Sequence, residues 1–82
     1  MSGRIRGAGQ LRLLQQALDQ APCDHCILIN LGVLVDKLGQ TAKALVLIRR
    51  ALRYAPDDDL LRHALLNHIR RMEEKITDER LR

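Results

Sequence analysis

The four residues from Cys23 to Cys26 read Cys-Asp-His-Cys and form the densest set of metal-binding and redox-active side chains in the sequence. Two thiolates at this spacing chelate zinc, and thiolates near a helix N-terminus are reactive. Zinc prefers four ligands, however, and the remaining histidines, His63 and His68, have no paired spacing with another ligand. Thioredoxin-like redox chemistry requires a βαβ context that the sequence lacks. We therefore interpret both cysteines as structural and assign no metal or cofactor, with metal binding and redox chemistry as the alternatives.

Acid–base catalysis would require a histidine or carboxylate beside a nucleophile. His63 and His68 have no such neighbour at a useful offset along a helix. Glu73 and Glu74 lie among basic residues at the spacing of ordinary ion pairs on a helix surface. We therefore predict that the protein is not an enzyme, and we assign no catalytic residue.

The composition favours a small helical domain. A chain of 82 residues forms one domain whose single core is marginally stable unless a bound metal or a partner stabilises it. Apolar residues make up 46% of the chain but include a single aromatic, Tyr54, so aliphatic side chains must build the core. No apolar run approaches the roughly 18 residues of a membrane span, and no signal-peptide pattern opens the sequence. We expect a cytoplasmic protein with reduced thiols.

Two helical patterns, His25 to Leu38 and Thr41 to Ala55, occupy the centre of the sequence. Asp24 is a suitable N-cap for the first, and Gly39 stands where a left-handed residue ends a helix. Gly32 allows the second helix to approach the first closely. These features predict an antiparallel helical hairpin.

A further helix is predicted from Gln10 to Ala21, before this hairpin. No earlier helix covers its apolar stripe, which consists of Leu11, Leu14 and Leu18. We assign these leucines to self-association, because the exposed edge of a helical stack must be covered by a neighbour.

The C-terminal part of the sequence restarts a helix after Pro56, where three aspartates complement the helix dipole. Its amphipathic stripe reaches Ile76. We therefore predict a flexible basic arm for residues 1–9, a helical domain for residues 10–76 and a C-terminal tail for residues 77–82.

The apolar and small residues of the hairpin are spaced in a way that resembles the tetratricopeptide repeat (TPR) pattern W-x2-L-G-x2-Y…A-x3-F…P. The matching residues are Leu28, Leu31, Gly32, Val35, Ala44, Ile48, Ala51 and Pro56, with aliphatic residues at the three aromatic positions. Pro22 and Pro56 stand 34 positions apart, which is the length of one repeat. Residues 10–76 thus resemble one full repeat with a half-repeat on each side. The resemblance implies an all-α fold of antiparallel helix hairpins stacked as a short right-handed solenoid of about four helices.

TPR domains bind peptides or helices in a concave groove, so the resemblance implies a protein-interaction module that works as a scaffold, adaptor or chaperone-like protein. It places the groove on two helices, with Cys26, Ile29, Asn30, Val33 and Lys37 on one and His63, Asn67, Arg70 and Arg71 on the other. An aliphatic floor with a basic rim favours a protein or peptide partner with apolar anchors and acidic flanks. We also expect the protein to form a homo-oligomer.

An alternative function follows from the net charge of +4, namely binding of nucleic acid or another anionic surface. The residues concerned are Arg4, Arg6, Arg12, Arg49, Arg50 and Arg53. We favour a protein partner, because the sequence offers no aromatic platform for base stacking. Salt dependence separates the two functions, since phosphate binding weakens steeply with added salt.

Overall fold

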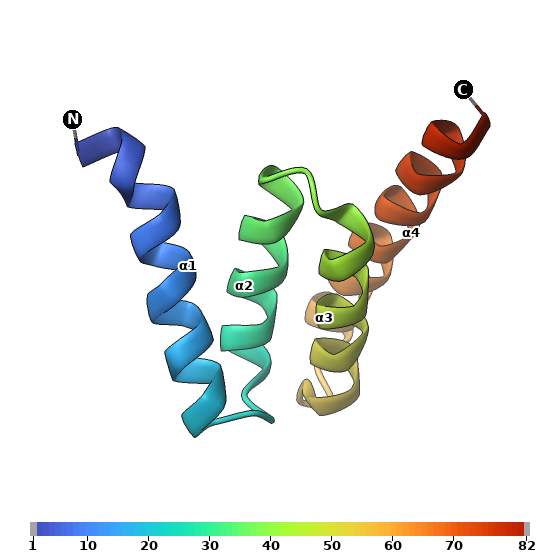
Figure 1. The fold of residues 1–82 in the computed structure, drawn as a ribbon. Coiled ribbons are helices and arrows are strands. Elements are labelled where there is room, and N and C mark those ends of the chain that lie inside the picture. The colour runs from blue at the N-terminus through green and yellow to red at the C-terminus, as the bar shows by residue number, and fades with distance from the viewer. Residues whose placement is uncertain (1, 82) are drawn as a thin grey trace.

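A computed structural model describes the backbone of residues 2–81 and the side chains of residues 9–81; this part contains α-helices and no strand. The helices are α1 (Ser2–Gln20), α2 (His25–Lys37), α3 (Thr41–Tyr54) and α4 (Asp59–Leu81). Figure 1 shows that successive helices run antiparallel and follow one another in chain order. The backbone of α1 approaches α2, that of α2 approaches α3, and that of α3 approaches α4. This arrangement is the all-helical repeat stack that the sequence predicts.

Both ends of α2 carry the predicted caps. Asp24 Oδ1 accepts hydrogen bonds from the backbone N–H groups two and three residues later, at 2.9 and 3.2 Å. At the other end Gly39 has a φ of +88°, which places it in the left-handed region that favours glycine. The N–H groups of Gly39 and Gln40 donate to carbonyls in the last turn of α2 and so form a Schellman motif. These caps fix the turn that joins α2 to α3.

Gly32 allows α2 and α3 to pack closely, as predicted. A Cβ atom at this position would lie 2.7 Å from Ile48 Cδ1, so only glycine fits the present arrangement. The core around this contact is built from buried apolar residues of α2, α3 and α4. Its buried apolar residues are Leu28, Leu31, Val35, Ala44, Leu47, Ile48, Ala51, Leu65, Ile69 and Met72.

The start of α4 is fixed by one of the three aspartates that follow Pro56. Asp58 Oδ1 accepts hydrogen bonds from the N–H groups of Leu60 and Leu61 at 3.0 and 3.2 Å. Asp58 thus satisfies two backbone donors that the first turn of any helix leaves without a partner. The predicted helix start after Pro56 is therefore confirmed.

The outer helices extend beyond the predicted boundaries. Residues 2–9, predicted as a flexible arm, continue α1, and residues 77–81, predicted as a tail, continue α4. Extension costs little once a packed segment has nucleated a helix, which explains both differences. The flexibility expected for the arm and the side chains of Arg4 and Arg6 lie outside what the structure describes. Within residues 2–81 no helix is both long enough and apolar enough to cross a membrane.

Candidate functional site

Asp36 joins three helices through its carboxylate. Its Oδ1 atom accepts a hydrogen bond from Thr41 Oγ1 of α3 at 2.9 Å and another from Lys75 Nζ of α4 at 3.2 Å. The Asp36 side chain is 17% exposed and that of Lys75 is 50% exposed. The bridge from Asp36 to Lys75 therefore spans the space between α2 and α4 at the edge of the protein surface.

The pKa of Asp36 reflects this environment. Burial by itself raises the pKa of the carboxyl group, because it disfavours the charged form. The hydrogen bonds from Thr41 and Lys75, together with the positive charges of Lys75 and His68, outweigh burial and hold the pKa below its ordinary value. Asp36 is consequently ionised at neutral pH and acts as a fixed negative charge.

A shallow hollow opens beside this bridge, and we refer to it as the α2–α4 hollow. It is lined by Asp36, His68, Arg71, Met72 and Lys75. Within the described part of the chain, His68 Nε2 is buried and has no hydrogen-bond partner. The hollow thus combines three basic side chains with a single carboxylate that already has two partners.

The groove residues predicted on α2 lie along one side of that helix. Cys26, Asn30 and Lys37 are exposed, and Val33 is half-buried. Ile29 is also half-buried, but its side chain packs in part against the core. Four of the five are therefore available at the surface without a role in the core.

The groove residues predicted on α4 are all exposed, but they do not share one surface feature. Arg71 lines the α2–α4 hollow together with Asp36 of α2. Asn67, Arg70 and Arg71 also line a depression that belongs to α4 alone, while His63 lines neither. Of the four groove residues predicted on α4, Arg71 is therefore the one that lines a hollow together with a residue of α2.

Of the five residues that line the α2–α4 hollow, the sequence-based groove includes only Arg71. Two of the four omitted residues, His68 and Lys75, carry basic side chains on α4. A signal for them was present, because both stand three or four positions from Arg71 and so share its side of the helix. The hollow joins residues of the two helices on which the groove is predicted, α2 and α4, so we take it as the candidate for partner contact.

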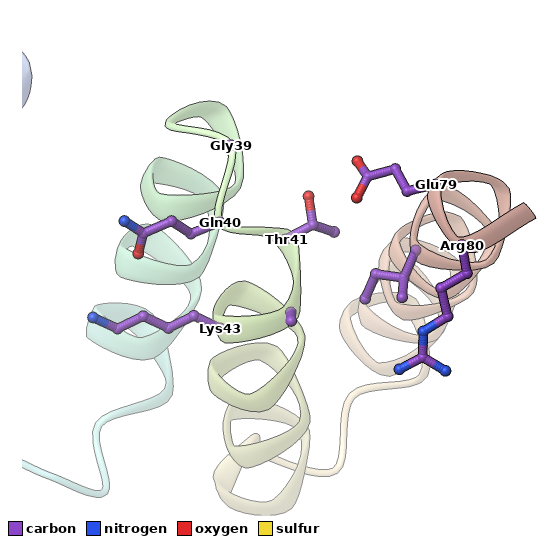
Figure 2. A pocket seen from close by; sticks show the side chains of 8 residues that line it. Gly39, Gln40, Thr41, Lys43, Glu79 and Arg80 are labelled. Atoms are coloured by element: carbon purple, nitrogen blue, oxygen red, sulfur yellow. The ribbon is translucent and has the colours of Figure 1, made fainter. Parts of the chain in front are cut away.

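A second opening lies between the α2–α3 turn and the end of α4 (Figure 2). Its lining residues are Gly39, Gln40, Thr41, Ala42, Lys43, Ile76, Glu79 and Arg80. Figure 2 shows Gln40 and Lys43 directed away from α4, and Glu79 directed toward Thr41. Thr41 is 5% exposed and its hydroxyl is bonded to Asp36, so it offers no free donor to a ligand here.

The arginines of α3, which belong to the predicted anionic-surface site, are partly engaged within the chain. Arg49 forms an ion pair with Glu73 of α4. Arg50 Nη2 donates to the carbonyl oxygen of Pro22 at 3.3 Å. Arg53 and Arg12 are exposed. Two of the α3 arginines therefore hold neighbouring segments together in addition to any role at the surface.

The leucines predicted for self-association lie on α1 and are only partly buried. Leu11, Leu14 and Leu18 all pack in part against the core. Leu13, which the sequence-based set omits, is 67% exposed. The core therefore partly covers the three leucines that we expected to be exposed. The neighbouring Leu13 is the more exposed leucine of α1.

The two cysteines are free and exposed. Cysteines that serve packing alone are usually buried, where they behave as small apolar side chains. The interpretation of Cys23 and Cys26 as structural residues therefore receives no support from their position.

Comparison with known proteins gives a family assignment. A family model described as tetratricopeptide repeat matches residues 1–69. No curated protein and no solved structure matches the chain. The matched region includes α1, α2, α3 and about half of α4, and repeats of this family generally mediate protein–protein interaction. The chain therefore belongs to the tetratricopeptide repeat family.

Proposed function

We propose that this TPR domain binds a peptide or helix with apolar anchors and acidic flanks along the surface between α2 and α4. It would serve as a scaffold, adaptor or chaperone-like module. The observation that carries the proposal is the charge around the α2–α4 hollow, which is lined by two cationic side chains, Arg71 and Lys75, and a single carboxylate, that of Asp36. A carboxylate from a partner would therefore meet an excess of positive charge at this place.

The size of the α2–α4 hollow supports a peptide rather than a small molecule. Its volume is about 230 Å³, whereas pockets for small molecules usually measure about 300–1,000 Å³. Such a hollow suits one side chain of a longer partner. Val33 supplies apolar surface nearby on α2, and Lys37 adds positive charge toward the end of the same helix.

Selection from a library of random linear peptides displayed on phage tests this proposal. We expect the enriched peptides to combine aliphatic residues with Asp or Glu. Arg71→Glu should bind a synthetic copy of such a peptide at least tenfold more weakly in fluorescence anisotropy, because it replaces attraction with repulsion. The matched control is Arg53→Glu, which changes an exposed arginine of α3 outside the hollow and should bind like the wild type.

Two outcomes would count against peptide binding at this place. One is enrichment of peptides that contain no acidic residue. The other is equal affinity of Arg71→Glu and wild-type protein for the enriched peptide.

We also propose that the protein self-associates through the outer surface of α1. Within the described residues the backbone of α1 approaches that of one other helix, α2. Repeats of this kind bury their apolar faces against neighbours on both sides. A second copy would cover Leu13 and the open parts of Leu14 and Leu18 through the symmetric contact typical of homodimers.

A further inference from the structure

Asp24, His25 and Cys26 bring three different kinds of metal ligand together at the start of α2. One ligand atom from each residue lies within 4.8 Å of the other two. Cys26 Sγ stands 3.5 Å from His25 Nε2, within hydrogen-bonding distance, so the two side chains are directed toward each other. Asp24 and Cys26 are exposed and His25 is half-buried, so an ion in solution has access to the group.

The distance between sulfur and nitrogen is that of two ligands on one zinc ion. With Zn–S of about 2.3 Å and Zn–N of about 2.0–2.1 Å, a tetrahedral ion holds these two atoms about 3.6 Å apart. Cys26 and His25 thus already have the separation that zinc requires. We propose that the segment from Cys23 to Cys26 binds one Zn²⁺ ion per chain.

Asp24 keeps this segment in place. Its Oδ1 atom accepts hydrogen bonds from the N–H groups of Cys26 and Ile27, which fixes the backbone that carries the sulfur and imidazole ligands. A carboxylate has two oxygens, so capping the helix through one leaves the other for the ion. Hydrogen bonding of a ligating carboxylate also orients it, as is common around metal centres.

Cys23 supplies the fourth ligand in this proposal. Its thiol is free and exposed, and it precedes Asp24 directly. It stands outside the group of three in the structure, but rotation of its side chain can bring the sulfur toward the ion. The Cys-x-x-Cys spacing is the one found in structural zinc sites. Each thiol loses its proton to solvent as the S–Zn bond forms, so zinc affinity increases with pH.

Cobalt(II) is the probe for this site, because a tetrahedral cobalt ion bound by thiolate shows a charge-transfer absorption band. Titration of the reduced wild-type protein should produce this band and saturate at one cobalt ion per chain. One equivalent of zinc should then remove it. Because these measurements do not involve a peptide, their outcome does not depend on whether the proposed groove binds one.

Variants identify the ligands. The double variant Cys23→Ser, Cys26→Ser should lose the band completely, and His25→Gln should bind cobalt at least tenfold more weakly. Asp24→Asn keeps a helix cap, since asparagine caps as well as aspartate, and should weaken cobalt binding with unchanged circular dichroism. His63→Gln is the matched control, because His63 is an exposed histidine on α4 outside the group. It should titrate like the wild type.

The inference is overturned by any of three results. The first is a wild-type spectrum without the thiolate band. The second is a band that persists in the double cysteine variant. The third is equal cobalt affinity of His25→Gln and the wild type.

Discussion

Gly32 of α2 lies directly against Ile48 of α3, with room for a hydrogen atom but not for a methyl group. A Cβ on Gly32 would stand 2.7 Å from Ile48 Cδ1 and 2.9 Å from Ile48 Cγ1. Ile48 is fully buried, so its side chain has little space into which it can move. This contact sets the separation of the two central helices.

Gly32→Ala should therefore destabilise the protein, although alanine is the better helix former. Overpacking costs about 1–3 kcal/mol, while the gain in helix propensity is about 1 kcal/mol. We expect a net loss of up to about 2 kcal/mol in the free energy of unfolding, measured by urea denaturation. Ile48→Val removes the Cδ1 atom and should cost less in the Gly32→Ala background than in the wild type. Additive effects of the two substitutions would contradict the proposed clash.

Asp36 should make stability depend on acid pH. Its folded pKa lies below the ordinary value of 3.8, so its contribution is present above that value and is lost as pH falls through the folded pKa. Asp36→Asn should lower the free energy of unfolding by about 1–2 kcal/mol at neutral pH, since it weakens hydrogen bonds to a charged group. The difference between variant and wild type should shrink as the pH falls below 3.8 and through the folded pKa of Asp36.

Urea denaturation at neutral and acid pH provides this measurement. Asp57→Asn changes an exposed carboxylate in the α3–α4 turn and serves as the control, with an expected effect within about 0.5 kcal/mol at neutral pH. An equal loss for Asp36→Asn at both pH values would show that its charge is not the cause.

Val33 and Ile29 should respond differently to aspartate. Val33→Asp should abolish binding of the selected peptide and leave helicity nearly unchanged, because Val33 is half-buried and lies outside the core contacts. Ile29→Asp should also lower the melting temperature, since Ile29 packs in part against the core. Circular dichroism and fluorescence anisotropy separate these effects. If Val33→Asp unfolds the protein, Val33 belongs to the interior and the groove assignment is wrong.

Leu13 and Leu14 should separate self-association from folding. Leu13 is 67% exposed, so Leu13→Glu should shift an oligomer toward monomer with little loss of helicity. Leu14→Glu should weaken both association and folding, because Leu14 also packs in part against the core. Sedimentation equilibrium over a concentration series measures the association. A wild type that remains a folded monomer at high micromolar concentration would rule out self-association.

The sequence predicts the central hairpin closely because its ends carry strong local signals. Asp24 and Gly39 place the ends of α2 to within one residue. Residues 1–9 contain three glycines, and the predicted apolar stripe of the last helix ended at Ile76. Propensity and periodicity therefore did not reveal that both helices extend further.

The candidate site could be predicted only in part. Arg71 follows from the repeat spacing, whereas the roles of His68 and Lys75 depend on how α4 is rotated about its own axis. The packing of Leu65, Ile69 and Met72 sets that rotation. The rotation therefore depends on how the core is assembled, which the helical spacing of the sequence does not specify. The ligand separation between His25 and Cys26 likewise requires side-chain conformations that spacing does not specify.

The step-by-step packing of the helices has a consequence for amide hydrogen exchange. The backbone of α1 approaches only α2, and that of α4 approaches only α3, within the described residues. In such a linear array each end opens without disrupting the centre. Amides of α2 and α3 should therefore exchange slowest, at the rate of global unfolding, whereas α1 should exchange by local opening. Because Lys75 bridges to Asp36, the C-terminal half of α4 has an additional contact with α2 and should exchange more slowly than α1.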